Sequence, residues 1–295
     1  MTPPISNGIA GLAERYDGFI LDMWGVLHDG VRALPGVPEA LRELKTAGKT
    51  LIVLSNAPRR ADKVFERAAS VGVPTNLLDG VMSSGEDCWR ALYGRAGPDA
   101  EPFHARLGRR VWLMGAKKDH DVIAGLDVEV AETIESADFV LNVGPAPLRE
   151  SLADYAGELD AARAADLPML CCNPDRVVMV GDRAAMCAGA LAERYESMGG
   201  AVYWHGKPYP GVYARTLALM ADIPKARVLA VGDSLLTDVA GAAAAGVDCA
   251  FAAGGIHGKD LGVDVGEAPS AAAVDALLAD APVIPTYVIG GLQWV

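Results

Sequence analysis

Three aspartates stand directly after, or close behind, apolar segments that have the character of buried strands. Asp22 follows GFIL, Asp233 follows VLAVG, and Asp238 comes five residues later at the start of an expected helix. Open parallel α/β sheets bind ligands beyond the carboxyl ends of their strands, so we expect these carboxylates at one sheet edge. Each aspartate alone could simply cap a helix. Together they predict a Mg²⁺ site, with Asp22 as a metal ligand or a nucleophile.

Two further segments supply groups that bind phosphate. Ser55 and Asn56 end the apolar run LIVL with a hydroxyl and an amide, and Lys207 lies between a glycine and a proline in HGKPYPG. A hydroxyl and an amide can hold a phosphoryl oxygen, and a lysine offers it a compact positive charge. The order of these groups and their common place at strand ends favour one shared site over a set of solvated surface residues.

Apolar strands alternate with amphipathic helices in the segments that must position these residues. This pattern fills residues 17–81 and resumes after about residue 204. It is typical of a parallel α/β sheet with helical crossovers. The stretch between has its own strands, VWLM, DFVLNVG, MLCC and VVMVG, and one long helix. The sequence therefore predicts a core domain of residues 1–82 and 204–295, with an inserted cap domain at residues 83–203.

Composition and charge exclude several classes of partner. The chain has 295 residues, of which 51% are apolar, which is enough for two domains with substantial cores. Its net charge of -12 and its lack of clustered Lys and Arg argue against nucleic acid. No apolar tract reaches the roughly 20 residues that span a bilayer, and the N-terminal segment lacks the pattern of a secretory signal. We expect a cytoplasmic protein with no nucleic-acid or membrane partner, whose five cysteines are buried free thiols.

Four motifs, FILDMWGVLHDG, LIVLSNAPRR, HGKPYPGVY and VLAVGDSLLTDVAG, together resemble those of class IIA of the haloacid dehalogenase (HAD) superfamily. The cap segments VWLMG, DFVLNVG and CCNPDRVV extend the resemblance over nearly the whole chain. This branch contains phosphatases of nucleotides, pyridoxal phosphate and phosphoglycolate. The resemblance implies an α/β fold, with a Rossmann-like parallel-sheet core and an inserted α/β cap. It also implies a Mg²⁺-dependent hydrolase of a small phosphorylated metabolite such as a sugar, nucleotide or cofactor phosphate, and it leaves a homodimer open.

The same resemblance implies roles around the metal. Asp22 would attack phosphorus and form an aspartyl phosphate. Mg²⁺ would be held by Asp22, by the backbone carbonyl of Trp24 and by Asp233, and Asp238 would orient the metal shell. In phosphoryl transfer such positioning and charge stabilisation are the main contributions of the protein.

Substrate contacts follow from the resemblance as well. Ser55 and Lys207 would neutralise charge on the transferring phosphoryl group, next to Asn56. In the segment CCNPD, Asn173 and Asp175 resemble the cap loop that faces the substrate in relatives. The alternative interpretation of this pair is a plain Asx-Pro turn.

One position departs from the phosphatase pattern Asp-x-Asp-Gly, in which the second aspartate protonates the leaving oxygen and then activates water. Trp24 stands there, and an indole can do neither, which typically costs about 10²- to 10⁴-fold in rate. Three interpretations follow. The first is a phosphatase that uses His28 or Asp29 for proton transfer instead. The second is a hydrolase of substrates whose leaving group needs no protonation, such as an acyl phosphate or, less favoured, a compound with a carbon–halogen bond. The third is a phosphate-ligand binding or regulatory protein without turnover.

Other polar residues carry no recognisable site pattern. Asp182 follows Val-Gly as Asp233 does, but no carboxylate stands five residues later, so we interpret it as a turn residue or helix cap. The scattered histidines, His104 and His205 among them, lack metal-ligand spacing and predict no site.

Overall fold

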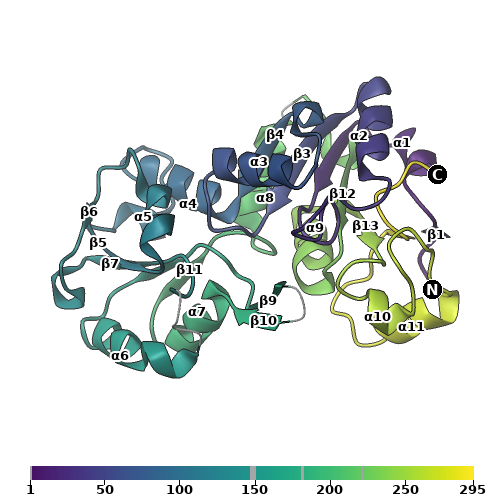
Figure 1. The fold of residues 1–295 in the computed structure, drawn as a ribbon. Helices are drawn as coiled ribbons and strands as arrows, with labels where there is room; N and C mark the ends of the chain where they lie inside the picture. The colour runs from purple at the N-terminus through teal and green to yellow at the C-terminus, as the bar shows by residue number, and fades with distance from the viewer. Residues whose placement is uncertain (1, 147–150, 181–182, 221) are drawn as a thin grey trace. The chain divides into compact units, whose positions relative to one another are not determined.

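The computed structural model describes residues 2–146, 151–180, 183–220 and 222–295. The chain forms two compact units (Figure 1). Unit 1 runs to Ser55 and continues with Asp62–Met82 and Lys207–Val295, while unit 2 comprises Asn56–Ala61 and Ser83–Gly206. These bounds differ from the predicted domains in two places, because residues 56–61 and 204–206 group with unit 2. Asp182 lies outside the described residues.

Unit 1 is built on a seven-stranded sheet in the order β1-β14-β13-β12-β2-β3-β4. Neighbouring strands from β1 through β3 pair in parallel. Every residue of the adjacent strands β2 and β12 is buried, as in parallel sheets that are covered on both faces. The strands are β1 Ile5–Ser6, β2 Gly18–Leu21, β3 Thr50–Ser55, β4 Gly80–Ser83, β12 Val228–Gly232, β13 Asp248–Ala252 and β14 Tyr287–Ile289.

The helices of unit 1 pack apolar side chains that recur at helical spacing. In α2, Val37, Ala40, Leu41 and Leu44 are buried, which is the i, i+3, i+4, i+7 pattern of one helix face. The expected helix after Asp233 begins as a π-helical turn, Leu235–Val239, and continues as α9. The helices are α1 Ala10–Ala13, α2 Val37–Thr46, α3 Ala61–Ser70, α8 Pro210–Ala218, α9 Ala240–Ala245, α10 Gly258–Leu261 and α11 Ala271–Leu278, with short 3₁₀ turns at Thr75–Leu77 and Lys225–Arg227.

Unit 2 has its own parallel sheet, in the order β11-β8-β7-β5-β6, and two buried apolar clusters of its own. The sheet and the separate core confirm the predicted α/β fold of the inserted part. Its elements are α4 Ser84–Tyr93, α5 Pro102–Ala105, β5 Arg110–Met114, β6 Glu129–Val130, β7 Phe139–Asn142, α6 Ala156–Ala164, β8 Met169–Cys171, α7 Ala188–Ser197 and β11 Val202–Trp204, with 3₁₀ turns at Lys117–Ile123, Ile134–Ser136 and Leu152–Tyr155.

The segment VVMV, residues 177–180, lies outside this sheet. Its strand, β9 Val177–Val180, pairs antiparallel with β10 Arg183–Met186 in a two-stranded sheet. The predicted strand is present, and Val177 at its start is 55% exposed. A pairing of only two strands leaves much of each strand open to solvent.

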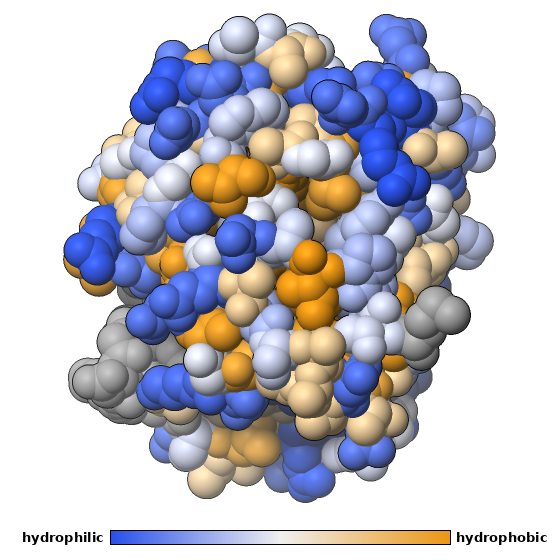
Figure 2. Space-filling view, turned by 90° about the vertical axis from the view of Figure 1, so that its right-hand side faces the viewer, coloured by the Kyte–Doolittle hydropathy of each residue, from blue (hydrophilic) through white to orange (hydrophobic). Residues whose placement is uncertain are grey.

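Exposed apolar side chains occur as small groups between hydrophilic ones on the face of the molecule drawn in Figure 2. Such scattered apolar groups are ordinary on a protein surface. Within the described residues, no helix combines the length and the apolar character that crossing a membrane requires.

Candidate active site

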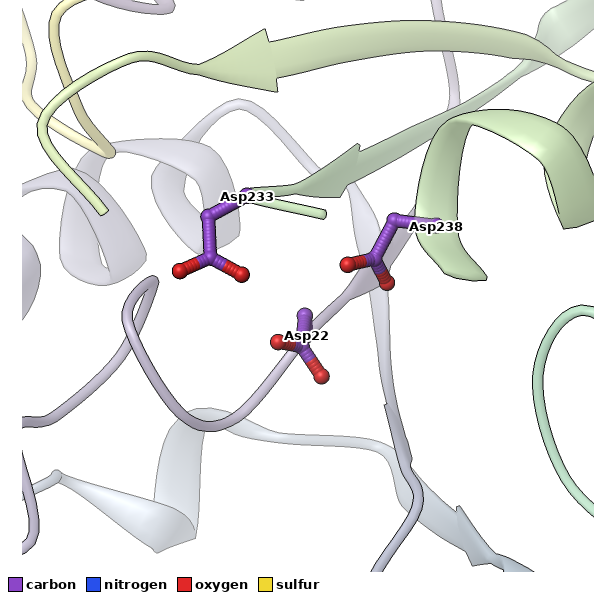
Figure 3. A group of neighbouring side chains, drawn as sticks. All are labelled: Asp22, Asp233 and Asp238. Atoms are coloured by element: carbon purple, nitrogen blue, oxygen red, sulfur yellow. The ribbon is translucent and has the colours of Figure 1, made fainter. Parts of the chain in front are cut away.

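Three carboxylates converge at the ends of β2 and β12. Asp22 follows β2 directly, Asp233 follows β12, and Asp238 lies in the π-helical turn behind it (Figure 3). One oxygen from each lies within 4.8 Å of the others, and all three side chains are buried. The Asp22 N–H donates to the Val231 carbonyl at 2.9 Å, which ties the end of β2 to β12. The predicted carboxylate cluster is therefore present.

Lys207 completes the cluster with a buried positive charge. Its ammonium donates to Asp22 Oδ1 and, at 2.6 Å, to Asp238 Oδ1. With Asp233, the group holds three carboxylates and one ammonium, so full ionisation leaves two uncompensated negative charges. A divalent cation with a preference for oxygen ligands would balance them, and this charge deficit and donor set fit Mg²⁺.

The protonation of the cluster reflects this excess of negative charge. Burial, followed by repulsion from Asp238, raises the pKa of Asp22 to about 7. Burial also raises the pKa of Asp233, and the charges of Asp22 and Asp238 add to that effect. For Lys207, burial acts to lower the pKa, but Asp22 and Asp238 outweigh it and raise the pKa above its usual value. The lysine therefore stays charged, whereas protons compete with a cation for the carboxylates.

Without a divalent cation, the stability of the protein should fall as pH rises between 5 and 7. The Asp22 carboxyl has an ordinary pKa of 3.8 and a folded pKa of about 7, so the folded state binds more protons in this window. One extra proton makes the free energy of unfolding decrease by up to about 1.4 kcal/mol per pH unit. Urea unfolding at pH 5, 6 and 7 in EDTA measures this slope. Saturating Mg²⁺ should flatten it, and an equal slope in Asp22→Asn would contradict the assignment to Asp22.

Two glycines make room for the Asp233 carboxylate. A Cβ atom on Gly25, which has a φ of +80°, or on Gly255 would overlap the Asp233 side chain. The Ile256 N–H donates to Asp233 Oδ2 at 2.8 Å. The carboxylate is thus fixed between two close backbone segments, an arrangement that the sequence analysis missed. The signal for the second segment was the glycine pair directly after the apolar run DCAFAA.

Gly255→Ala should weaken Mg²⁺ binding about tenfold. The backbone at Gly255 does not require a positive φ, so alanine causes no backbone strain there. The new methyl group instead displaces the Asp233 carboxylate, and such overpacking costs about 1–3 kcal/mol in packed sites. Titration calorimetry with MgCl₂ measures the change. Gly11→Ala is the matched control, because a Cβ there has no atom within 4 Å. Equal affinities in the two variants would show that this contact does not position Asp233.

Ser55 lies at the same sheet edge as the carboxylates, whereas the next residue, Asn56, belongs to unit 2. Leu21 pairs with Val53, so Ser55 at the end of β3 is one residue beyond the level of Asp22. Asn56 belongs to unit 2, where its amide donates to Asp175 Oδ1 at 2.9 Å.

The predicted cap residues meet in a local turn of unit 2. Asn173 Oδ1 accepts the Asp175 N–H at 2.9 Å, which is an Asx turn. Asn56 Oδ1 accepts the Ser84 hydroxyl at 3.3 Å. The structure therefore brings Asn56, Asn173 and Asp175 together in unit 2, and their contact with substrate stays a prediction.

The segment that follows Asp22 places Trp24 against His28. The two rings meet edge to face, with centroids 5.4 Å apart, and the indole is 36% exposed. His28 is buried, its Nδ1 accepts the Gly30 N–H at 3.0 Å, and burial followed by Arg67 lowers its pKa. A histidine with a lowered pKa is neutral at pH 7, which makes His28 a poor donor of the proton that the leaving oxygen needs.

Asp29 has the geometry of a turn residue. Its Oδ1 accepts the N–H groups of Val31 and Arg32 at 2.8 Å each, and these two bonds lower the pKa of its carboxyl. An ionised carboxylate held in this way favours the turn interpretation over a substitute acid.

Tyr213 is a further residue that the sequence analysis missed. Its hydroxyl donates to the Asp238 carbonyl at 3.1 Å, and both residues are buried. The bond ties α8 to the π-helical turn that carries Asp238, and such turns occur often at functional sites. No spacing rule links a tyrosine six residues after Lys207 with this carbonyl, so the contact depends on the three-dimensional structure.

Comparisons with known proteins agree with this geometry. Residues 19–129 match the family model of haloacid dehalogenase-like hydrolases, and residues 204–281 match a model described as HAD-hydrolase-like. A solved haloacid dehalogenase-like hydrolase from Brucella suis 1330 is 32% identical, with a TM-score of 0.79 and coverage of 97% of this chain and 98% of that chain. Chronophin from Homo sapiens is 28% identical over 239 residues, which are 76% of this chain and 77% of chronophin.

A third similar protein shares the fold. It is the glycerol phosphate phosphatase from Mycobacterium tuberculosis, solved in complex with magnesium, at a TM-score of 0.70 and 22% identity, over 96% of this chain and 76% of that one. The family models cover both ends of unit 1, and the Brucella suis hydrolase extends the match over nearly the entire chain. The chain therefore belongs to the haloacid dehalogenase superfamily of hydrolases.

Proposed function

We propose that the protein is a Mg²⁺-dependent phosphatase of a small phosphorylated metabolite. The observation that carries the proposal is the buried cluster in which Lys207 bridges Asp22 and Asp238 beside Asp233. The names of the relatives support the reaction class, because they include chronophin and phosphatases of 4-nitrophenyl phosphate and D-glycerol 3-phosphate.

The metal ligands in this proposal are Asp22, Asp233 and the backbone carbonyl of Trp24, and Asp238 orients the metal shell. Mg²⁺, when bound, supplies positive charge that stabilises the phosphoryl oxygens. Substitution of the side chain at position 24 leaves a carbonyl there, so Trp24 is compatible with a metal site. The magnesium in the similar glycerol phosphate phosphatase supports the choice of ion.

Asp22 is the nucleophile in the proposed reaction. One of its carboxylate oxygens forms a bond to phosphorus while the bond from phosphorus to the leaving oxygen breaks, which gives an aspartyl phosphate. Water then attacks phosphorus, the bond to Asp22 breaks, and inorganic phosphate leaves. Lys207 and Ser55 stabilise the negative charge on the transferring phosphoryl group, a role that needs fixed hydrogen-bond donors in a buried site. Lys207 is suited to it because it is charged and buried.

Trp24 narrows the expected substrates. An indole stands at the usual place of the acid and base, His28 is buried, and Asp29 is held in a turn, so none of these three side chains is placed to donate the proton. Phosphates whose leaving group departs without protonation should therefore react best, such as aryl or acyl phosphates. Hydrolysis of this narrower class is the second candidate function, and the observation that favours it is Trp24.

Phosphate release from p-nitrophenyl phosphate, acetyl phosphate and a panel of alkyl and sugar phosphates, with Mg²⁺ or with EDTA, tests both candidates. Turnover of alkyl and aryl esters that stops in EDTA supports the general phosphatase. Turnover confined to aryl and acyl phosphates supports the narrower class. Binding of phosphate or Mg²⁺ without any turnover would overturn both and favour a binding protein built on the same scaffold.

A further inference from the structure

A chain of polar side chains inside unit 2 has no part in the proposed reaction. His104 and His205 are 1% and 0% exposed, and their Nε2 atoms lie 3.0 Å apart. Each Nδ1 faces a carboxylate, Glu101 Oε2 at 2.9 Å for His104 and Asp87 Oδ2 at 2.6 Å for His205. The four groups thus form three consecutive contacts at hydrogen-bond distance, Glu101–His104, His104–His205 and His205–Asp87.

Each of these three contacts needs one hydrogen, and two neutral histidines that face ionised carboxylates cannot supply them all. Glu101 Oε2 also accepts the N–H groups of Phe103 and His104, at 2.8 and 3.3 Å, so it acts as an acceptor and the Nδ1 of His104 is the donor. A neutral imidazole carries one N–H and one lone pair. Two neutral histidines therefore bring two hydrogens to three contacts, and a lone pair would have to face either another lone pair or an ionised carboxylate.

We propose that His104 and His205 share one additional proton, so that unit 2 contains a buried proton-binding site between the carboxylates of Glu101 and Asp87. The extra hydrogen completes either the contact between the two rings or the contact between His205 and Asp87, and three of the four ring nitrogens carry a hydrogen in both cases. Within the described part of the chain, no third histidine, cysteine or carboxylate converges with the two Nε2 atoms, which favours a proton over a metal ion as their shared partner.

The groups around the pair retain the extra proton at neutral pH. Burial acts to lower the pKa of His205, but the Cys88 sulfur and the Asp87 carboxylate raise it to about 10. Burial acts to raise the pKa of the Cys88 thiol, while Cys172 and His205 lower it. The ring of Tyr203 completes the surroundings, with its centroid 4.4 Å from that of His104 and 5.0 Å from that of His205.

The site joins the two ends of unit 2. After the core strand β4, the chain enters unit 2 at Ser83, and Asp87 lies in its first helix, α4. At the other end, His205 precedes Gly206, the last residue of the unit, and its N–H donates to the Cys171 carbonyl at 2.9 Å. The shared proton therefore fastens α4 and α5 to the end of β11. Loss of the proton at high pH should loosen this connection.

NMR of the full chain with ¹⁵N-labelled histidine counts the protons directly. At pH 8 the two rings should show three protonated nitrogens out of four, and the signals should be assigned by their loss in His104→Gln and His205→Gln. His257→Gln is the control, because His257 lies outside the pair in unit 1. Two neutral rings at pH 7 would overturn the proposal. So would a zinc or copper ion found at one per chain by elemental analysis of the purified protein.

A second count uses Cys88→Ser protein, in which the neighbouring thiol can neither give a hydrogen to His205 nor hold a negative charge. The carboxylates of Glu101 and Asp87 remain, so the two rings should still show three protonated nitrogens at pH 7. A count of two in this variant would mean that the third hydrogen belongs to Cys88, and it would overturn the shared additional proton.

Discussion

Asp22→Asn should release no phosphate from any substrate that the wild type hydrolyses, a loss of at least about 10⁴-fold. The amide has nearly the same shape as the carboxylate, but it lacks the nucleophilic oxygen and gives up one of the two charged partners of Lys207. The lysine keeps Asp238 at 2.6 Å, so the side chain should remain in place. Steady-state phosphate release with saturating Mg²⁺ measures the loss.

Asp17→Asn is the matched control for this variant. Asp17 precedes the same strand, β2, at its other end, where it pairs with Arg227 at the surface. Removal of that carboxylate should leave turnover within about twofold of the wild type. Far-ultraviolet circular dichroism confirms that both variants fold. If folded Asp22→Asn kept more than about 1% of wild-type turnover, another nucleophile would have to be sought.

The location of the site could be predicted because it depends on features that are local in sequence. Asp22 and Asp233 each follow a fully buried apolar strand, and parallel strands end at the same edge of a sheet. β2 and β12 are neighbours in the sheet although Asp22 and Val228 lie 206 positions apart, and the pattern predicts a common sheet edge without specifying which strands are adjacent. Lys207 is assigned to the same site because its segment also follows a predicted strand and offers a positive charge.

The buried histidine pair could not be predicted, because the sequence carries no sign of it. His104 lies in the segment GRAGPDAEPFHARLG, whose glycines and prolines are typical of a loop, but the structure forms α5 there and buries the histidine. His205 stands 101 residues away. Spacing rules detect ligands that share a helix or a turn, and they fail for groups that only the tertiary fold brings together.

The domain boundaries differ for a related reason. Residues 59 and 60 fall within the predicted core domain, but Arg60 Nε donates to Glu86 Oε2 at 2.7 Å, and its guanidinium stacks on Trp89 at 3.9 Å. These contacts within unit 2 involve residues 26 and 29 positions later, which periodicity does not reveal. The side chain of Arg60 is 23% exposed, so it is not a freely solvated surface arginine.

Trp24→Asp should raise the turnover of alkyl phosphates by about 10²-fold or more. The new carboxyl would stand two residues after the nucleophile, where the family's phosphatases carry their acid and base, and such a group contributes about 10²- to 10⁴-fold. p-Nitrophenyl phosphate, which needs little protonation of its leaving group, should gain less than about tenfold in the first step. Parallel kcat measurements on glycerol phosphate and p-nitrophenyl phosphate give the ratio that distinguishes acid catalysis from a general gain in activity.

Trp24→Asn separates proton transfer from the loss of the indole. Both substitutions remove the ring that packs on His28 and over Gly30, so both carry the same structural change. Only the aspartate can donate and accept a proton, so only Trp24→Asp should gain activity on alkyl esters. Equal gains in both variants would mean that the indole obstructs the site. Equal losses would mean that the exposed indole itself contacts the substrate, and the protein would then be a selective hydrolase whose tryptophan has replaced acid catalysis with recognition.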